Sequence, residues 1–216
     1  MARFDLCVIT ARSDRLNRHH LDVARAALEG GCRLLQLRDK DLGSRALFDL
    51  GRQMRRLCDQ WQALLIINDR LDMALAVKAD GVHLGDQDLP IAIARRLLGP
   101  QAIIGASVRT AEEAQRAQAA GASYLGVGPV YATMSKTDAG TAIGLRPIAE
   151  IGADVSIPAL AIGGISHDNV GEVIRAGAAG VAVISAVSEA RDMVTATAEL
   201  LEAVRAAHQI PSGAKT

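Results

Sequence analysis

The chain has 216 residues with 24 basic and 24 acidic side chains, so its formal net charge is zero. Two Phe, two Tyr and one Trp leave few rings for stacking on bases, and no basic stripe stands out, so we expect no nucleic-acid partner. No uninterrupted apolar stretch approaches the ~20 residues of a membrane helix, so we expect no membrane association.

The N-terminal segment and the cysteines indicate the compartment. MARFDLCVIT has a short, interrupted apolar run, which is typical of a strand rather than of a signal peptide. Cys7, Cys32 and Cys58 are odd in number and show no CxxC spacing. We therefore expect buried free thiols in a reducing cytoplasm, with no redox or zinc site.

One pattern recurs along the chain. A helical segment ends in small residues and glycine, and an apolar run follows, as in AVKADGVHLG and VIRAGAAGVAVIS. Glycine at a helix end before a buried strand is typical of the junctions in an alternating βα fold. The pattern, together with further apolar runs, predicts eight strands, beginning near Leu6, Arg33, Ala63, Gly81, Ala102, Tyr124, Pro158 and Gly180.

Helical patterns fill the gaps between these strands. Helices are predicted from Thr110, as the capping residue, to Ala120, and over residues 167–176 and 188–207. The strands are apolar throughout, as expected when both faces are covered. An open doubly wound sheet is the alternative, but no GxGxxG follows the first strand and no switch point appears. We predict an α/β fold, a single-domain (β/α)8 TIM barrel over residues 1–207, with a disordered tail over 208–216.

Ligands of such barrels bind at the carboxyl ends of the strands, so those ends are the candidate sites. The second strand ends in QLRDK, where alternation places Gln36, Arg38 and Lys40 on one side and Leu37 and Asp39 on the other. Two cations and an amide suit a diphosphate or a polar heterocycle. The alternative is a surface salt-bridge cluster with Asp39 and Asp41.

Acidic residues follow the next two strands. Asn68 and Asp69 end the third strand, and an Asn-Asp pair there is also a common helix cap. HLGDQD ends the fourth, where Asp86 is a candidate cap and Asp88 a candidate for the barrel mouth. Asp69 and Asp88 together suit a Mg²⁺ ion that also binds substrate phosphates. His83 is interpreted as a packing residue.

The remaining strand ends predict a second anion site. Ser107 ends the fifth strand, and the sixth opens into YATMSKTDAGTAIG, which is rich in hydroxyls and glycine. Gly163 and Gly164 follow the seventh strand and Ser185 the eighth, which matches the recurrent phosphate site of barrel enzymes. The alternative role for the glycines is tight helix–strand packing. Two anion sites suit two small phosphorylated substrates.

In order, the motifs QLRDK, ND, HLGDQD, GASV, GPVYATMSK, AIGGI and VISA resemble those of the thiamine phosphate synthase family, and the match runs from about Leu6 to Ala207. The resemblance implies an enzyme that joins a pyrimidine diphosphate to a thiazole phosphate, which in some cases carries a carboxylate lost as CO₂, and releases pyrophosphate. It implies Mg²⁺ as cofactor. Ser135 stands where threonine is common in the family, and Asp39 where glutamate is common.

The resemblance also implies roles for individual residues. The metal ligands would be Asp69 and Asp88. The pyrimidine diphosphate would be held by Gln36, Leu37, Arg38, Asp39, Lys40, Asn68, Ser107 and Lys136, of which Arg38, Lys40, Ser107 and Lys136 would be catalytic. The thiazole phosphate would be held by Thr133, Met134, Ser135, Gly164, Ile184 and Ser185.

Two other functions of the same barrel compete with this one. A thiazole tautomerase would keep the thiazole site with a degraded diphosphate site, and a non-catalytic phosphate-binding barrel would need no site for a departing diphosphate. The cationic set and both aspartates favour the synthase. We expect the polar segment from Thr133 to Ala142 to act as a mobile lid, and the sequence leaves a homo-oligomer open.

Overall fold

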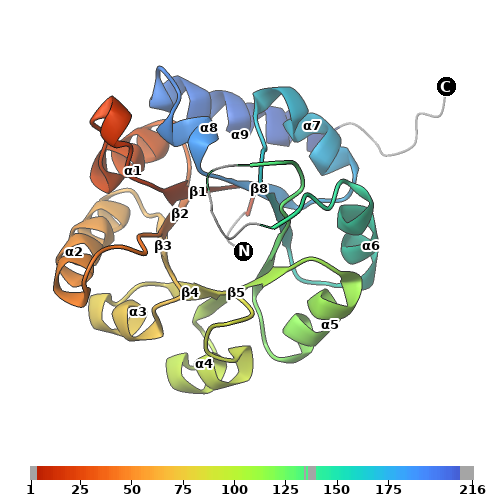
Figure 1. The fold of residues 1–216 in the computed structure, drawn as a ribbon, viewed down its shortest axis with the longest axis horizontal. Coiled ribbons are helices and arrows are strands. Elements are labelled where there is room, and N and C mark those ends of the chain that lie inside the picture. Colours follow the sequence, from red (N-terminus) through yellow and green to blue (C-terminus); the bar gives the residue numbers. More distant parts are fainter. Residues whose placement is uncertain (1–3, 134, 136–139, 210–216) are drawn as a thin grey trace.

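The chain forms a closed barrel of parallel strands in chain order, each followed by helical structure (Figure 1). This computed structural model describes residues 4–133, 135 and 140–209. The strands are β1 (Leu6–Thr10), β2 (Leu34–Leu37), β3 (Leu64–Asn68), β4 (Gly81–Leu84), β5 (Ile103–Val108), β6 (Tyr124–Val127), β7 (Ala159–Ile162) and β8 (Gly180–Val183). β8 pairs with β1 and closes the ring. The predicted TIM barrel is confirmed.

The helices form a ring outside the strands (Figure 1). They are α1 (His20–Glu29), α2 (Ser44–Gln60), α3 (Leu71–Val77), α4 (Ile91–Leu98), α5 (Ala111–Ala119), α6 (Arg146–Asp154), α7 (His167–Arg175), α8 (Ser185–Ser188) and α9 (Met193–Gln209), with a short 3₁₀ helix η1 (Asp14–Leu16) after β1. Within the described ranges, no helix has the length and apolar character needed to cross a membrane.

The eight predicted strand starts are confirmed to within one residue. The helix predicted over 188–207 is wrong at its start, because α8 and α9 are separate and residues 189–192 connect them. Asp192 is the reason. Its carboxylate accepts the backbone N–H groups of Val194 (2.9 Å) and Thr195 (3.1 Å), so it caps a new helix. α9 also runs to Gln209, into the predicted tail, and residues 210–216 lie outside the described part of the chain.

Strand alternation divides the core into two layers. Leu35 and Leu37 belong to the large cluster between strands and helices, whereas Leu34 belongs to a smaller cluster inside the barrel. Gln36 is 2% exposed and lines a small internal cavity. The predicted alternation along QLRDK is therefore confirmed for its strand portion, and it determines which side chains reach the mouth.

Glycines make room for two large rings inside the barrel. A Cβ atom on Gly105 would lie 2.3 Å from Tyr124 Cζ and 2.4 Å from His83 Nδ1, and one on Gly126 would lie 3.0 Å from His83 Cε1. Phe4 stacks on Tyr124 with ring centroids 5.3 Å apart. The strands thus carry small residues where the rings of β4 and β6 cross the interior.

The N-terminus of α5 provides a test of local stability. Thr110 Oγ1 accepts the Glu113 N–H at 3.2 Å, and Glu113 Oε2 accepts the Thr110 N–H at 3.3 Å, which completes a capping box. We expect Thr110→Ala to lower the free energy of unfolding by about 1 kcal/mol in chemical denaturation. Thr110→Ser keeps the hydroxyl and should retain most of that stability; an equal loss in both variants would contradict the cap.

Candidate active site

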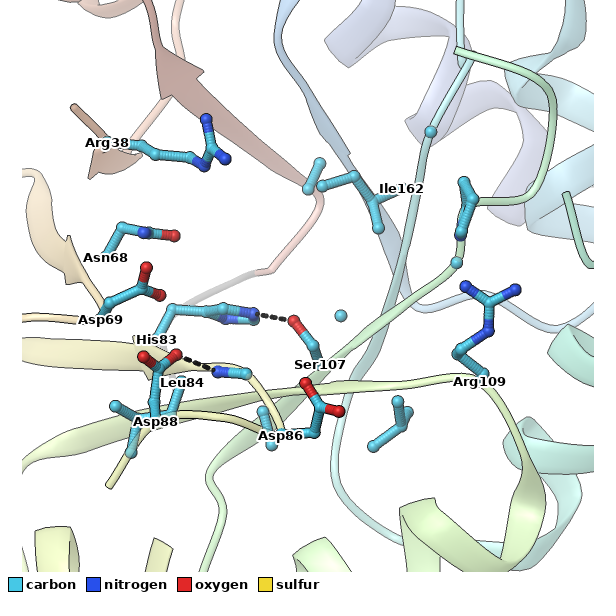
Figure 2. A pocket seen from close by; sticks show the side chains of 18 of the residues that line it. Arg38, Asn68, Asp69, His83, Leu84, Asp86, Asp88, Ser107, Arg109 and Ile162 are labelled. Atoms are coloured by element: carbon cyan, nitrogen blue, oxygen red, sulfur yellow. Dashed lines mark hydrogen bonds between the residues drawn. The ribbon is translucent and has the colours of Figure 1, made fainter. Parts of the chain in front are cut away.

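A cavity of about 900 Å³ lies at the carboxyl ends of the strands, within the range of small-molecule sites. Figure 2 shows acidic, amide and basic side chains converging on it from β2 to β5 and their following loops. It brings together, of the predicted residues, Arg38, Lys40, Asn68, Asp69, Asp88, Ser107, Thr133, Ser135, Gly163, Gly164, Ile184 and Ser185. Met134 and Lys136 lie outside the described residues.

Asp69 and Asp88 face each other at one side of the cavity (Figure 2). Burial, together with the hydrogen bond and charge of Asp88, raises the pKa of Asp69 to about 6, although Lys40 and Arg38 act in the opposite direction. Lys40 Nζ lies 3.8 Å from Asp69 Oδ2. Two carboxyl groups are therefore held close together although their charges repel.

The backbone holds both carboxyl groups in place. Asp69 has a left-handed φ of 60°, which Asp tolerates better than most residues, and its N–H donates to His83 O at 2.8 Å. Asp88 Oδ2 accepts the Gly85 N–H at 2.7 Å, which folds the turn after β4 back on itself. The first bond links the ends of β3 and β4, and the two together fix both acids at the cavity.

Neither acidic loop caps a helix with these side chains. Arg70 is the capping residue of α3 and Pro90 that of α4, and neither cap has a side-chain hydrogen bond. The alternative in which Asn68 and Asp69 form a cap is therefore wrong, as is a capping role for Asp86 on α4.

The carboxyl pair fits a hard divalent cation. Mg²⁺ commonly takes one or two carboxylates and completes its shell with water and substrate phosphate oxygens. Among the described residues, no group of three or more His, Cys, Asp or Glu side chains is placed to hold a metal. A Mg²⁺ ion at Asp69 and Asp88 would thus need oxygen atoms from a ligand, and Arg38 and Lys40 line the same cavity.

The other residues of QLRDK point elsewhere. Leu37 packs in the outer layer, and Asp39 binds His20 and Arg12 behind the loop. Gln36 lies below the main cavity, and its Oε1 has no partner among the described residues. The alternative salt-bridge cluster is present in part, because Arg12 makes ion pairs with Asp39 (3.1 Å) and Asp41 (3.6 Å).

His83 connects the core to the cavity, which the sequence analysis missed in treating it only as packing. Its Nε2 lies 3.0 Å from Ser107 Oγ and its Nδ1 2.9 Å from Tyr124 Oη (Figure 2). A neutral imidazole donates at one nitrogen and accepts at the other. The ring therefore couples the Ser107 hydroxyl, which faces the cavity, to the buried Tyr124 phenol. The available signal was a histidine one residue before the end of a strand that leads to the mouth.

The residues of the predicted second anion site also line the cavity. Ser135 Oγ donates to Ser185 Oγ at 3.0 Å, and the Ser135 N–H donates to Thr133 Oγ1 at 3.2 Å. Gly163 and Gly164 have φ values of 97° and 65°. A Cβ on Gly164 would lie 2.7 Å from Tyr131 Cβ, so close packing also accounts for this glycine. The predicted lid, Thr133 to Ala142, includes residues 134 and 136–139, which lie outside the described part.

Arg109 is a cavity residue that sequence reasoning did not find. It follows β5 and lines the side opposite Asp69 (Figure 2). One guanidinium nitrogen donates to Thr141 O at 2.6 Å, which ties the end of β5 to the segment before α6. Nothing in the motif GASVRT distinguished this arginine from an ordinary surface residue.

Comparison with known proteins gives one consistent family. The model of the family described as thiamine monophosphate synthase matches residues 6–187. A thiamine-phosphate synthase of Moorella thermoacetica is 50% identical over 94% of this chain and 97% of its own length. One of Methanoregula boonei is 48% identical over 96% of both chains. A solved thiamine phosphate pyrophosphorylase of Pyrococcus furiosus is 44% identical, covers 95% of this chain and 97% of its own, and superimposes with a TM-score of 0.86.

The Asp69–Asp88 pair predicts a pH-dependent stability. Because burial and Asp88 raise the pKa of Asp69 to about 6, its protonated form is favoured in the folded state, and stability is lost as pH rises through about 6. In EDTA, we expect Asp69→Asn to raise the thermal midpoint by roughly 2–4 °C at pH 7.5. The gain should be much smaller at pH 4.5, where the native carboxyl is already protonated, and should vanish only below the unfolded pKa of about 3.9.

Asp72→Asn is the matched control for this measurement. Asp72 lies three residues along the chain, and the hydrogen bond from Arg70 lowers its pKa. Removing its charge should leave the midpoint unchanged or slightly lower at pH 7.5. A midpoint that falls in Asp69→Asn as well would show that the two carboxylates do not oppose each other.

Proposed function

The chain belongs to the thiamine monophosphate synthase family and is a transferase, and on that premise we propose that it joins an aminopyrimidinylmethyl diphosphate to a thiazole phosphate, giving thiamine phosphate and pyrophosphate. The observation that carries the proposal is the carboxyl pair of Asp69 and Asp88, which shares one cavity with Arg38 and Lys40. A diphosphate with a bound divalent cation complements both charges.

In this reaction the protein must stabilise the pyrophosphate anion as it leaves. The bond between the methylene carbon and the diphosphate oxygen breaks, and its electron pair leaves with pyrophosphate. The amino-substituted pyrimidine is electron-rich and carries the positive charge that develops on the carbon. The lone pair of the thiazole nitrogen then forms the new carbon–nitrogen bond. No general base is needed at the reacting carbon.

We assign the diphosphate to the side of the cavity formed by β2, β3 and β4. Arg38 and Lys40 would bind the oxygens that gain charge as the bond breaks, and preorganised cations there favour the transition state over the ground state. Asp69 and Asp88 would hold Mg²⁺, which when bound neutralises charge on the pyrophosphate. Lys136 would add a third positively charged side chain, after Arg38 and Lys40.

The remaining polar groups would orient the two rings. Asn68 and Ser107 line the cavity beside the diphosphate side, so we assign them to the pyrimidine, with Gln36 below them. Thr133, Ser135, Gly164, Ile184 and Ser185 line the other side, and we assign them to the thiazole phosphate. Holding the nitrogen in line with the breaking bond supplies much of the rate enhancement.

We propose a cytoplasmic location from the state of the cysteines. Cys7, Cys32 and Cys58 are all buried and form no disulfide. That pattern supports the proposed reducing cytoplasm. A homo-oligomer stays a prediction from the sequence.

Pyrophosphate release tests the proposed function. Purified protein is mixed with the aminopyrimidine diphosphate, the thiazole phosphate and Mg²⁺, and pyrophosphate is followed with and without EDTA. We expect release that needs both substrates and stops with EDTA. No release, together with binding of thiazole phosphate alone, would instead support a tautomerase or a non-catalytic phosphate-binding barrel.

Variants test the residue roles within the same assay. We expect Arg38→Ala to lower kcat about 100-fold, and Arg38→Lys to recover part of it, because a point charge replaces a two-pronged donor. Asp69→Asn and Lys136→Ala should each lower turnover, whereas Asp72→Asn should not. Unchanged turnover in Asp69→Asn would remove the metal assignment, and unchanged turnover in Lys136→Ala would remove its role at the diphosphate.

A further inference from the structure

Asp39 stands between the two cavity cations in the chain, yet its side chain faces the opposite way. Its side chain is 3% exposed and contacts His20 of α1 instead of lining the cavity. Oδ2 lies 3.0 Å from His20 Nε2 and 3.1 Å from Arg12 Nε. Oδ1 accepts the backbone N–H groups of Asp41 (2.9 Å) and Leu42 (2.8 Å). One carboxylate thus receives four donors.

His20 connects this carboxylate to the end of β1. The ring is 3% exposed, and its Nδ1 lies 2.9 Å from Oγ1 of Thr10, which is fully buried. Burial lowers the pKa of His20, so the ring is neutral at physiological pH. Nε2 then carries the proton and donates to Asp39, because a carboxylate only accepts, and Nδ1 accepts from the Thr10 hydroxyl.

The carboxylate is ionised in this setting. Burial alone raises the pKa of Asp39, but the hydrogen bonds from His20 and from the N–H groups of Leu42 and Asp41 outweigh it, so the pKa lies below its ordinary value. A buried charge with a full set of donors holds one geometry, since any displacement leaves it unpaired.

The loop fixed in this way carries Arg38 and Lys40. Residues 38–43 have no regular secondary structure, and the Lys40 side chain is 49% exposed. Ordering such a loop during binding would cost affinity. We propose that Asp39 and His20 are positioning residues for the diphosphate: they hold the loop so that Arg38 and Lys40 are already directed at the ligand.

The inference rests on the proposed function. The charge of Asp39, taken alone, predicts the opposite effect on ligand binding. Asp39 is an anion near two cations that would bind an anion. Removing its charge alone would make the site more positive and strengthen pyrophosphate binding. Loss of the loop geometry would weaken binding instead. The direction of the change therefore separates positioning from charge.

The experiment measures binding of inorganic pyrophosphate with Mg²⁺ by calorimetry, and the KM of each substrate. For Asp39→Asn, whose amide would set a donor against His20 and Arg12, we expect about tenfold weaker pyrophosphate binding, similar to the loss of an outer partner at a metal site. The KM of the pyrimidine diphosphate should rise by a similar factor, and that of the thiazole phosphate should stay unchanged.

Asp80→Asn is the matched control. Asp80 also pairs with an arginine, with its Oδ2 2.5 Å from Arg55 Nη1, and accepts the Leu65 N–H at 2.7 Å, but it precedes β4 at the other end of the barrel. This variant should lower the thermal midpoint without changing pyrophosphate binding. Equal changes in the KM of both substrates in Asp39→Asn, or pyrophosphate binding that is unchanged or tighter, would overturn the proposal.

His20 supplies a second pair of variants, useful should Asp39→Asn fail to fold. The amide of His20→Gln can donate to Asp39 and accept from Thr10, whereas His20→Leu can do neither. We expect His20→Leu to weaken pyrophosphate binding and His20→Gln to restore most of it. Equal binding by the two variants would contradict the positioning role. Absence of turnover in the unmodified protein would instead contradict the proposed function.

Discussion

Two like-charged carboxyl groups at the ends of neighbouring strands set the chemistry of the cavity. Burial disfavours ionisation of Asp69, and the neighbouring Asp88 adds to this cost. Lys40 and Arg38 offset only part of it. An arrangement that costs stability in the empty protein, and that includes a left-handed aspartate, is the kind of strain found at binding sites. The proposed cation with its anionic ligand would relieve it.

Barrel closure is what allows such a site to form. Every strand runs in the same direction and pairs with its neighbours in sequence, so side chains from distant parts of the chain meet at one mouth. In the proposed function, the two anion-binding sides would arise from different strands, β2 to β4 for the diphosphate and β6 to β8 for the single phosphate. The two substrates would then meet across the mouth.

Much of this arrangement could be predicted from the sequence because it depends on local patterns. Apolar runs after helix-ending glycines located the strands, and the barrel rule then placed Asp69 and Asp88 at the mouth. Contacts that depend on packing between distant elements left no local signal: Asp39 meets His20 across 19 positions, and His83 meets Tyr124 across 41. The break before α9 was different, since Asp192 followed by Thr195 is a readable capping pattern that was missed.

A crystal structure with Mn²⁺ in place of Mg²⁺ and with inorganic pyrophosphate would test the central claim most directly, because the anomalous signal of manganese locates the metal without reference to the protein density. The account predicts one metal peak bound by both Asp69 and Asp88, with pyrophosphate between it and Arg38. A metal peak elsewhere, or pyrophosphate bound at Gly164 and Ser185 with no metal at the aspartates, would contradict it.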